Sequence, residues 1–141
     1  MTENQFVTKM RLVDSYKFDV DFDVDYLPTL VVDEPKPAGK GAGPNPPRML
    51  ATAIGHCMST SLIFCLNKAR IPVKSLETTV KTNLYRNEKQ RLRIKSIDLE
   101  IKLEVNEKDK QRVHRCLDIF EDYCTVTQSI RKGIEVNVNI N

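Results

Sequence analysis

The sequence has no tryptophan and few aromatic residues, and neither sign of charge dominates it. Its 141 residues include 22 Lys and Arg against 19 Asp and Glu, a net charge of +3, and aromatic residues make up 6%. Nucleic-acid-binding domains usually carry a concentrated basic face, and proteins that bind single strands stack bases on aromatic side chains. Because both features are weak here, we expect no nucleic acid partner.

Long apolar runs are also missing. A transmembrane helix needs about 20 predominantly apolar residues, and the sequence has no uninterrupted apolar run near that length. The first ten residues, MTENQFVTKM, are polar and lack the charged-then-apolar order of a signal peptide. We therefore expect a cytoplasmic protein with no membrane partner, whose cysteines are usually reduced. At this length, residues 1–141 can form a single domain with its own core.

Strict alternation of apolar and polar residues in YKFDVDFDVDY, residues 16–26, predicts a strand with one dry face. Four aspartates lie on the other face. Next-but-one residues of a strand are about 6.6 Å apart, too far for one metal ion, so we interpret this face as solvated. The flanking segments NQFVTKMRL (4–12) and TLVVDE (29–34) predict partner strands in an antiparallel meander.

A Gly/Pro-rich loop, residues 35–47, separates these strands from a long helix. Asn45 suits the N-cap of that helix, which we expect to run to about Ala69. Residues 53–66 carry no charge when His56 is neutral, which is typical of a helix buried on most of its circumference. One sheet covers only one side of such a helix, so we expect a homodimer.

The second half of the chain predicts two further strands within residues 71–87 and 91–105, with a bulge at the slip in alternation near Lys95–Ser96. A helix over about 107–122 and a final strand in GIEVNVNI (133–140) follow. The predicted fold class is α+β, in the order β-β-β-α-β-β-α-β, with a mainly antiparallel sheet.

The four cysteines form two pairs with the same separation, Cys57 with Cys65 and Cys116 with Cys124. Eight residues of helix rise about 12 Å, whereas a disulfide needs Cα atoms within about 7 Å. Neither pair can therefore bond within its helix. A four-cysteine zinc site is disfavoured for the same reason, and there is no CxxC motif. We expect no metal and no cofactor, and any partnership of sulfurs must cross between the helices.

The neighbours of each cysteine suggest which sulfurs are reactive. Cys65 and Cys116 stand beside bulky apolar residues, so we expect both to be buried free thiols that pack as small hydrophobic side chains. Cys57 in GHCMSTS and Cys124 in DYCTVTQS stand among small, hydroxyl and amide side chains, which can stabilise a thiolate. Two interpretations stay open for this second pair: a redox-active couple, or two more packing cysteines.

Two other residues are weaker candidates for chemistry. On a helix, His56 points about 100° away from its neighbour Cys57 and cannot serve it as a general base. Arg48, in the first turn of the long helix, is a candidate to bind an anion together with the helix N-terminus. An ordinary solvated arginine is the alternative for Arg48.

Three quoted segments resemble the OsmC/Ohr family. GPNPPRMLATAIGHCMSTSL (43–62) resembles its signature, with a G-x-N-P turn, a central helix, and a cysteine followed by small and hydroxyl residues. CTVTQSI followed by GIEVNVNI resembles its second-cysteine segment and final strand. The resemblance covers nearly the whole chain and implies an intertwined homodimer in which sheets of both subunits wrap two central helices. It also implies reduction of organic hydroperoxides, with Cys57 peroxidatic, Cys124 resolving, and a dithiol reductant.

The sequence departs from the family pattern near Cys57. The glutamate that usually follows the N-P turn aligns with Pro47, and the usual arginine has no counterpart, since Arg48 is nearby but not at the matching place. A thiolate without a cationic neighbour keeps a pKa near about 8.5. These departures indicate a divergent OsmC-like branch. The alternative function is a non-catalytic OsmC-like protein that binds an acyl or other hydrophobic small molecule.

Overall fold

The computed structural model describes residues 4–141, and the chain divides into two compact units, one up to Met49 and one from Leu50 onwards. Helix α1 (Pro46–Lys68) begins in the first unit and has most of its length in the second. Each unit has its own antiparallel sheet, which confirms the α+β class. A single domain over residues 1–141 stays a prediction.

The first unit is a three-stranded antiparallel meander, as the alternating pattern predicted. Its strands, in the order β1-β2-β3, are β1 (Lys9–Asp14), β2 (Lys17–Asp21) and β3 (Leu30–Val32). β2 ends before the alternation does, because Asp23 adopts a positive φ of 59° and its N–H donates to Asp21 Oδ1 at 2.8 Å. The Asp23 carboxylate pairs with Lys9 at 2.8 Å on the exposed surface, in line with a solvated aspartate face.

The Gly/Pro-rich loop after β3 is organised by a buried carboxylate. Asp33 accepts hydrogen bonds from the backbone N–H groups of Glu34, Lys40 and Ala42 at 2.8, 3.2 and 3.1 Å. The N–H of Ala42 contributes most to holding the pKa of Asp33 below its ordinary value, against the effect of burial. A Cβ at Gly39 would lie 2.5 Å from Asp33 Oδ1, so only glycine lets the loop close around this carboxylate.

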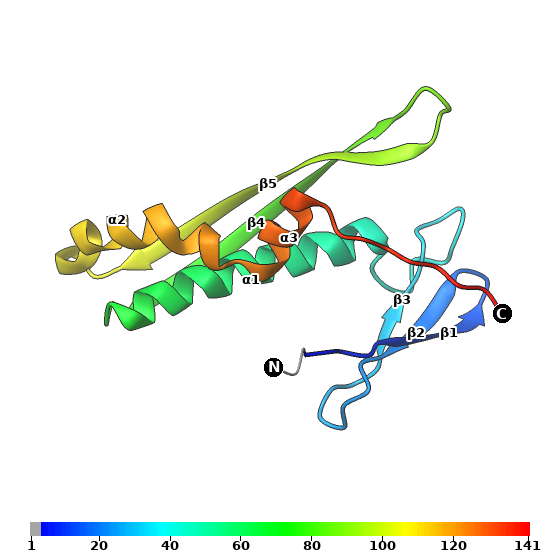
Figure 1. The fold of residues 1–141 in the computed structure, drawn as a ribbon, viewed down its shortest axis with the longest axis horizontal. Helices are drawn as coiled ribbons and strands as arrows, with labels where there is room; N and C mark the ends of the chain where they lie inside the picture. The colour runs from blue at the N-terminus through cyan, green and yellow to red at the C-terminus, as the bar shows by residue number, and fades with distance from the viewer. Residues whose placement is uncertain (1–3) are drawn as a thin grey trace. The chain divides into compact units, whose positions relative to one another are not determined.

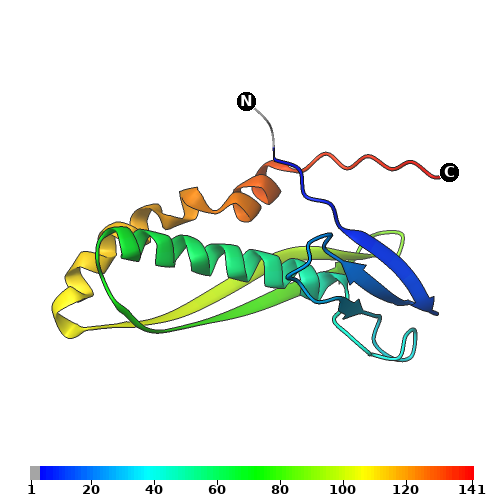
Figure 2. The same ribbon diagram turned by 90° about the horizontal axis from the view of Figure 1, so that it is seen from below.

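The second unit places α1 against a long β-hairpin formed by β4 (Val73–Arg86) and β5 (Leu92–Val105). Figure 2 shows α1 running between this hairpin and the helices α2 (Lys110–Ile119) and α3 (Thr125–Lys132). Short 3-10 helices, η1 (Glu107–Asp109) and η2 (Phe120–Tyr123), precede and follow α2. The predicted bulge is confirmed, since Asn83 pairs with Ser96 and Leu84 with Ile94, which skips Lys95.

A close approach lets α1 pack on β4. A Cβ added at Gly55 would lie 2.7 Å from Val80 Cγ2, so a side chain here would push the helix off the strand. One turn further on, Ser59 Oγ lies 2.6 Å from Thr78 Oγ1. The apolar core continues beyond this contact and draws on α1, β5 and α2, with the segment after α1; its buried members are Leu62, Leu66, Ile71, Val105, Val113 and Cys116.

By length and composition alone, α1 is apolar enough to cross a membrane, although polar residues interrupt its apolar run. Core helices of soluble proteins pass the same test. Here α1 buries Leu62 and Leu66 almost completely in the core of the second unit. Only 39% of its apolar window is buried, so packing within the chain covers part of α1, and the prediction of a helix buried on most of its circumference is wrong for the single chain.

The C-terminal part differs from the expected element order. The second helix is shorter than predicted, and α3 was not predicted at all. GIEVNVNI forms no strand with any strand of residues 4–141 and is extended instead (Figure 1). Its alternate apolar side chains, Ile134, Val136, Val138 and Ile140, are all exposed. A strand requires a ladder partner, and residues 4–141 of one chain supply none to this segment.

Candidate redox site

The two free cysteines of the chain meet in the second unit. Cys57 lies half-buried on α1, and Cys124, which is fully buried, lies between η2 and α3. The two thiols lie close enough for each to shift the pKa of the other. The structure therefore brings these two cysteines near each other, whereas the choice between a redox couple and two packing cysteines, like their catalytic roles, stays a prediction.

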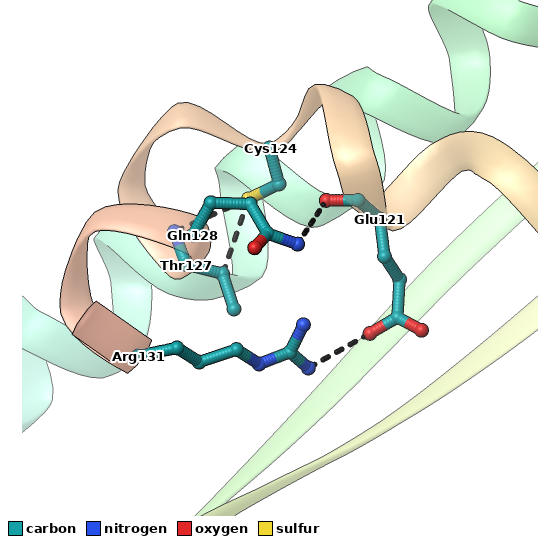
Figure 3. A network of polar contacts seen from close by, with 5 residues as sticks. All are labelled: Glu121, Cys124, Thr127, Gln128 and Arg131. Atoms are coloured by element: carbon teal, nitrogen blue, oxygen red, sulfur yellow. Dashed lines mark hydrogen bonds and ion pairs between the residues drawn. The ribbon is translucent and has the colours of Figure 1, made fainter.

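The turn that carries Cys124 is held by a polar network centred on Glu121 (Figure 3). The backbone carbonyl of Glu121 accepts from the N–H of Cys124 at 3.1 Å and from Gln128 Nε2 at 3.0 Å. The Glu121 carboxylate pairs with Arg131 at 2.9 Å. These contacts tie η2 to α3 and fix the direction in which the Cys124 side chain leaves the backbone.

Cys124 is the N-cap residue of α3. Its sulfur accepts from the backbone N–H of Thr127 at 3.4 Å, and its thiol donates to Thr127 Oγ1 at 3.1 Å, a contact in which the hydroxyl becomes the donor once Cys124 is ionised. The first turn of a helix has N–H groups without intrahelical partners, and its dipole favours negative charge there. The geometry therefore favours a thiolate at this position.

The surroundings shift the two thiols in opposite directions. Burial raises the pKa of Cys57, and Cys124 raises it further, while the backbone N–H groups of Val126 and Thr125 partly offset the rise. Burial also raises the pKa of Cys124, but the Thr127 hydroxyl, the Cys57 thiol and the N–H groups of Thr127 and Val126 outweigh it. The net pKa of Cys124 lies below its ordinary value, and that of Cys57 lies above.

The prediction of free thiols at Cys65 and Cys116 is wrong, because these residues form a disulfide. Their Cα atoms are 5.7 Å apart, and the bond joins α1 to α2 across 51 residues of sequence. Burial was predicted correctly for Cys116, which is 2% exposed, whereas Cys65 is only partly buried. Apolar neighbours in sequence report burial but do not report whether a second sulfur faces the first across two packed helices.

The remaining sequence candidates lie elsewhere. Asn45 caps α1 as predicted, and its Oδ1 accepts from both the backbone N–H and the guanidinium of Arg48 at 3.3 Å. A role for Arg48 as thiolate partner stays a prediction. His56 and His114 are exposed. Within residues 4–141 no group of three His, Cys, Asp or Glu side chains could hold a metal ion.

Sequence reasoning noted hydroxyl and amide side chains around Cys124 but did not single out Thr127. The usable signal was the spacing Cys-x-x-Thr at the start of a helix, which places a hydroxyl at N3 beside an N-cap side chain. Because the helix α3 was not predicted, there was no reason to place Cys124 at a helix N-terminus. The Glu121–Arg131 pair crosses from η2 to α3 and had no comparable signal.

An α+β fold with two free thiols meeting at a helix N-terminus defines a candidate thiol redox protein. The family model for OsmC-like protein matches residues 39–139. The chain belongs to the OsmC-like protein family.

Solved structures with the same fold cover nearly the whole chain. An OsmC-like protein from Mycoplasma pneumoniae has a TM-score of 0.72 at 16% identity, and the match covers 99% of this chain and 98% of that protein's chain. An OsmC-like protein of unknown function from Vibrio cholerae O1 biovar eltor has a TM-score of 0.71 at 15% identity, and the match covers 91% of this chain and 93% of that protein's chain. An organic hydroperoxide resistance protein OsmC from Legionella pneumophila has a TM-score of 0.65 at 14% identity, and the match covers 93% of this chain and 92% of that protein's chain. No curated protein sequence matches the chain significantly.

Proposed function

We propose that this protein is a thiol-dependent peroxidase that reduces organic hydroperoxides in defence against oxidative stress. The observation that carries the proposal is the proximity of Cys57 and Cys124, which are far apart in the sequence but close enough for each thiol to shift the pKa of the other. Cys57 is half-buried and therefore open to a small oxidant, whereas Cys124 is sealed behind it. Membership of a family that includes organic hydroperoxide resistance proteins supports the substrate class.

The reaction divides between the two sulfurs. The sulfur of Cys57 attacks the distal peroxide oxygen, the O–O bond breaks, and the alcohol leaves while Cys57 becomes a sulfenic acid. Cys124 then attacks that sulfur and displaces the oxygen as water, which yields a Cys57–Cys124 disulfide. A dithiol reductant restores both thiols by exchange. One hydroperoxide is reduced to alcohol and water for each dithiol oxidised.

The test measures consumption of cumene hydroperoxide with dithiothreitol as reductant. Cys57→Ser is expected to lower consumption to the background rate, because the attacking sulfur is gone. Cys124→Ser, treated with hydroperoxide in the absence of dithiothreitol, is expected to form no disulfide and to retain a sulfenic acid at Cys57, detected by a sulfenic-acid probe and mass spectrometry. The double variant Cys65→Ser/Cys116→Ser is the matched control, since it removes two sulfurs outside the site and is expected to retain turnover.

Wild-type protein that consumes no hydroperoxide would contradict the proposal and leave ligand binding without catalysis as the function to pursue. Peroxide treatment that joins Cys57 to a cysteine other than Cys124 would show that the resolving role had been assigned wrongly.

We further propose that the protein is a homodimer. The extended segment after α3 exposes Val136 and Val138 at 79% and 80%, and such alternating apolar residues are typical of a strand that pairs with another chain. The variant Val136→Asp/Val138→Asp is expected to lower the mass measured by light scattering from two chains to one. A wild-type mass of one chain would refute the dimer.

A further inference from the structure

The N-terminus of α3 treats the two sulfurs unequally. Cys124 is the N-cap residue and receives the N–H of Thr127 at 3.4 Å, with the Thr127 hydroxyl 3.1 Å from its sulfur. Cysteine is not among the preferred N-cap residues, which are Ser, Thr, Asp and Asn. A thiolate suits the position better than a thiol because it is a full acceptor at the positive end of the helix dipole.

In this site, one cysteine is accessible to hydroperoxide and the other is better placed to carry negative charge. Cys124 is fully buried, so hydroperoxide reaches Cys57 first. Cys57, however, lies where burial and the adjacent Cys124 both raise the pKa of its thiol. A half-buried thiol that must lose its proton, close to a sulfur that readily carries negative charge, is the arrangement of a proton donor and its base.

The charged groups near this turn do not replace that base. Arg131 from α3 pairs with Glu121 from η2 at 2.9 Å, so its charge is balanced locally. Asp122 on η2 is exposed. On α1, the stretch around Cys57 from residue 53 to 66 carries only His56 as a titratable group besides its cysteines, and His56 is exposed. The strongest contributions that favour a thiolate come from the hydroxyl, the backbone N–H groups and the thiol around Cys124.

We propose that Cys124 is the thiolate of the resting pair and the proton acceptor for Cys57, and that Thr127 is the positioning residue that holds this charge on Cys124. This inference rests on the proposed peroxidase function. It assigns to the start of α3 the activating role that an arginine beside the attacking cysteine would otherwise have.

The proton and electron movements balance. The Cys57 thiol passes its proton to the Cys124 thiolate as the Cys57 sulfur attacks the distal peroxide oxygen. The O–O bond breaks, and the departing alkoxide takes the proton from Cys124 and leaves as alcohol. Cys124 is then a thiolate again, in contact with the sulfenic acid, and displaces hydroxide, which solvent protonates to water. A dithiol reduces the resulting disulfide.

The first test titrates each thiol alone, without peroxide. Cys57→Ser leaves Cys124 as the only free thiol, and Cys124→Ser leaves Cys57, with the Cys65–Cys116 disulfide intact in both. The ultraviolet absorbance of the thiolate is expected to appear at lower pH in Cys57→Ser than in Cys124→Ser. The reverse order would overturn the proposal while leaving peroxidase activity itself untouched.

The second test uses Thr127→Val, which keeps the shape of the side chain and removes its hydroxyl. Because a hydrogen bond to a charged group contributes roughly a tenfold factor, hydroperoxide consumption at neutral pH is expected to fall about tenfold. The loss is expected to disappear at alkaline pH, where Cys124 ionises without help, and Thr127→Ser is expected to restore the wild-type profile. Ser129→Ala, which removes a hydroxyl from the exposed face of α3, is the matched control with an unchanged profile.

A loss in Thr127→Val that is the same at every pH, or that Thr127→Ser does not restore, would show that Thr127 acts on folding and not on the charge of Cys124. If wild-type protein consumes no hydroperoxide, the proposed function fails. The titration order would still decide where the negative charge resides.

Discussion

The Cys65–Cys116 disulfide is expected to contribute a large part of the stability of the second unit. Cross-linking removes loop-closure entropy from the unfolded chain, and the sequence separation here is 51 residues. The chain-entropy relation gives about 4 kcal/mol at 25 °C for a loop of this length. With an unfolding entropy of about 0.3 kcal/mol/K for a chain of this size, reduction of the bond is expected to lower the melting temperature by about 14 °C.

The assay compares thermal unfolding with and without a reductant, in the background Cys57→Ser/Cys124→Ser so that only this bond responds. Protein concentration is held constant, because association would make the melting temperature depend on it. The control adds Cys65→Ser and Cys116→Ser to that background and is expected to melt at one temperature in both buffers. A difference below about 2 °C in the parent background would refute the argument, since the bond would then constrain nothing that unfolds.

Three further predictions concern packing and charge. Gly55→Leu places a side chain where a Cβ would already lie 2.7 Å from Val80 Cγ2, and urea denaturation is expected to show a loss of about 1–3 kcal/mol, whereas an unchanged midpoint would contradict the close approach. Because the pKa of Asp33 is lower in the folded state, its carboxylate stabilises the fold above pH 3.8 and loses that effect as the pH falls through the folded-state pKa. Asp33→Asn is therefore expected to flatten the acid limb of the stability curve, and an identical acid limb would refute this. Arg112 pairs with the buried Asp109 at 2.8 Å, so Arg112→Leu is expected to cost about 1–3 kcal/mol, a loss that should shrink when Asp109→Asn is added.

Local patterns predicted most of the fold. The alternation of β2 and β5, the Asn45 cap of α1 and the bulge at Lys95 each depend on neighbours within a few residues, and all are present. The overlooked α3 has only eight residues, too few for a periodic pattern to stand out from the loop around it. The prediction of a last strand was wrong for a different reason, because a strand needs a hydrogen-bonding partner strand, which the spacing of residues in the sequence does not identify.

The candidate site shows the same division. Chemical surroundings in the sequence separated Cys57 and Cys124 from the other two sulfurs, and the proximity of these two thiols agrees with that separation. The disulfide was missed because it depends on how α2 lies across α1, a tertiary relation. The same relation explains the equal spacing, since two segments that pack in opposite directions bring Cys57 to Cys124 and Cys65 to Cys116 in one register.

In this register the Cys65–Cys116 pair lies inside the Cys57–Cys124 pair along the sequence. When the Cys65–Cys116 disulfide is formed, an unfolded chain no longer separates Cys57 from Cys124 by more than sixty residues. They become the two ends of a cross-linked stretch of about 18 residues, and the smaller loop-closure entropy then raises the rate at which they meet about sevenfold. In a molecule unfolded by oxidative damage, Cys57 and Cys124 would therefore pair with each other faster than with cysteines of other molecules.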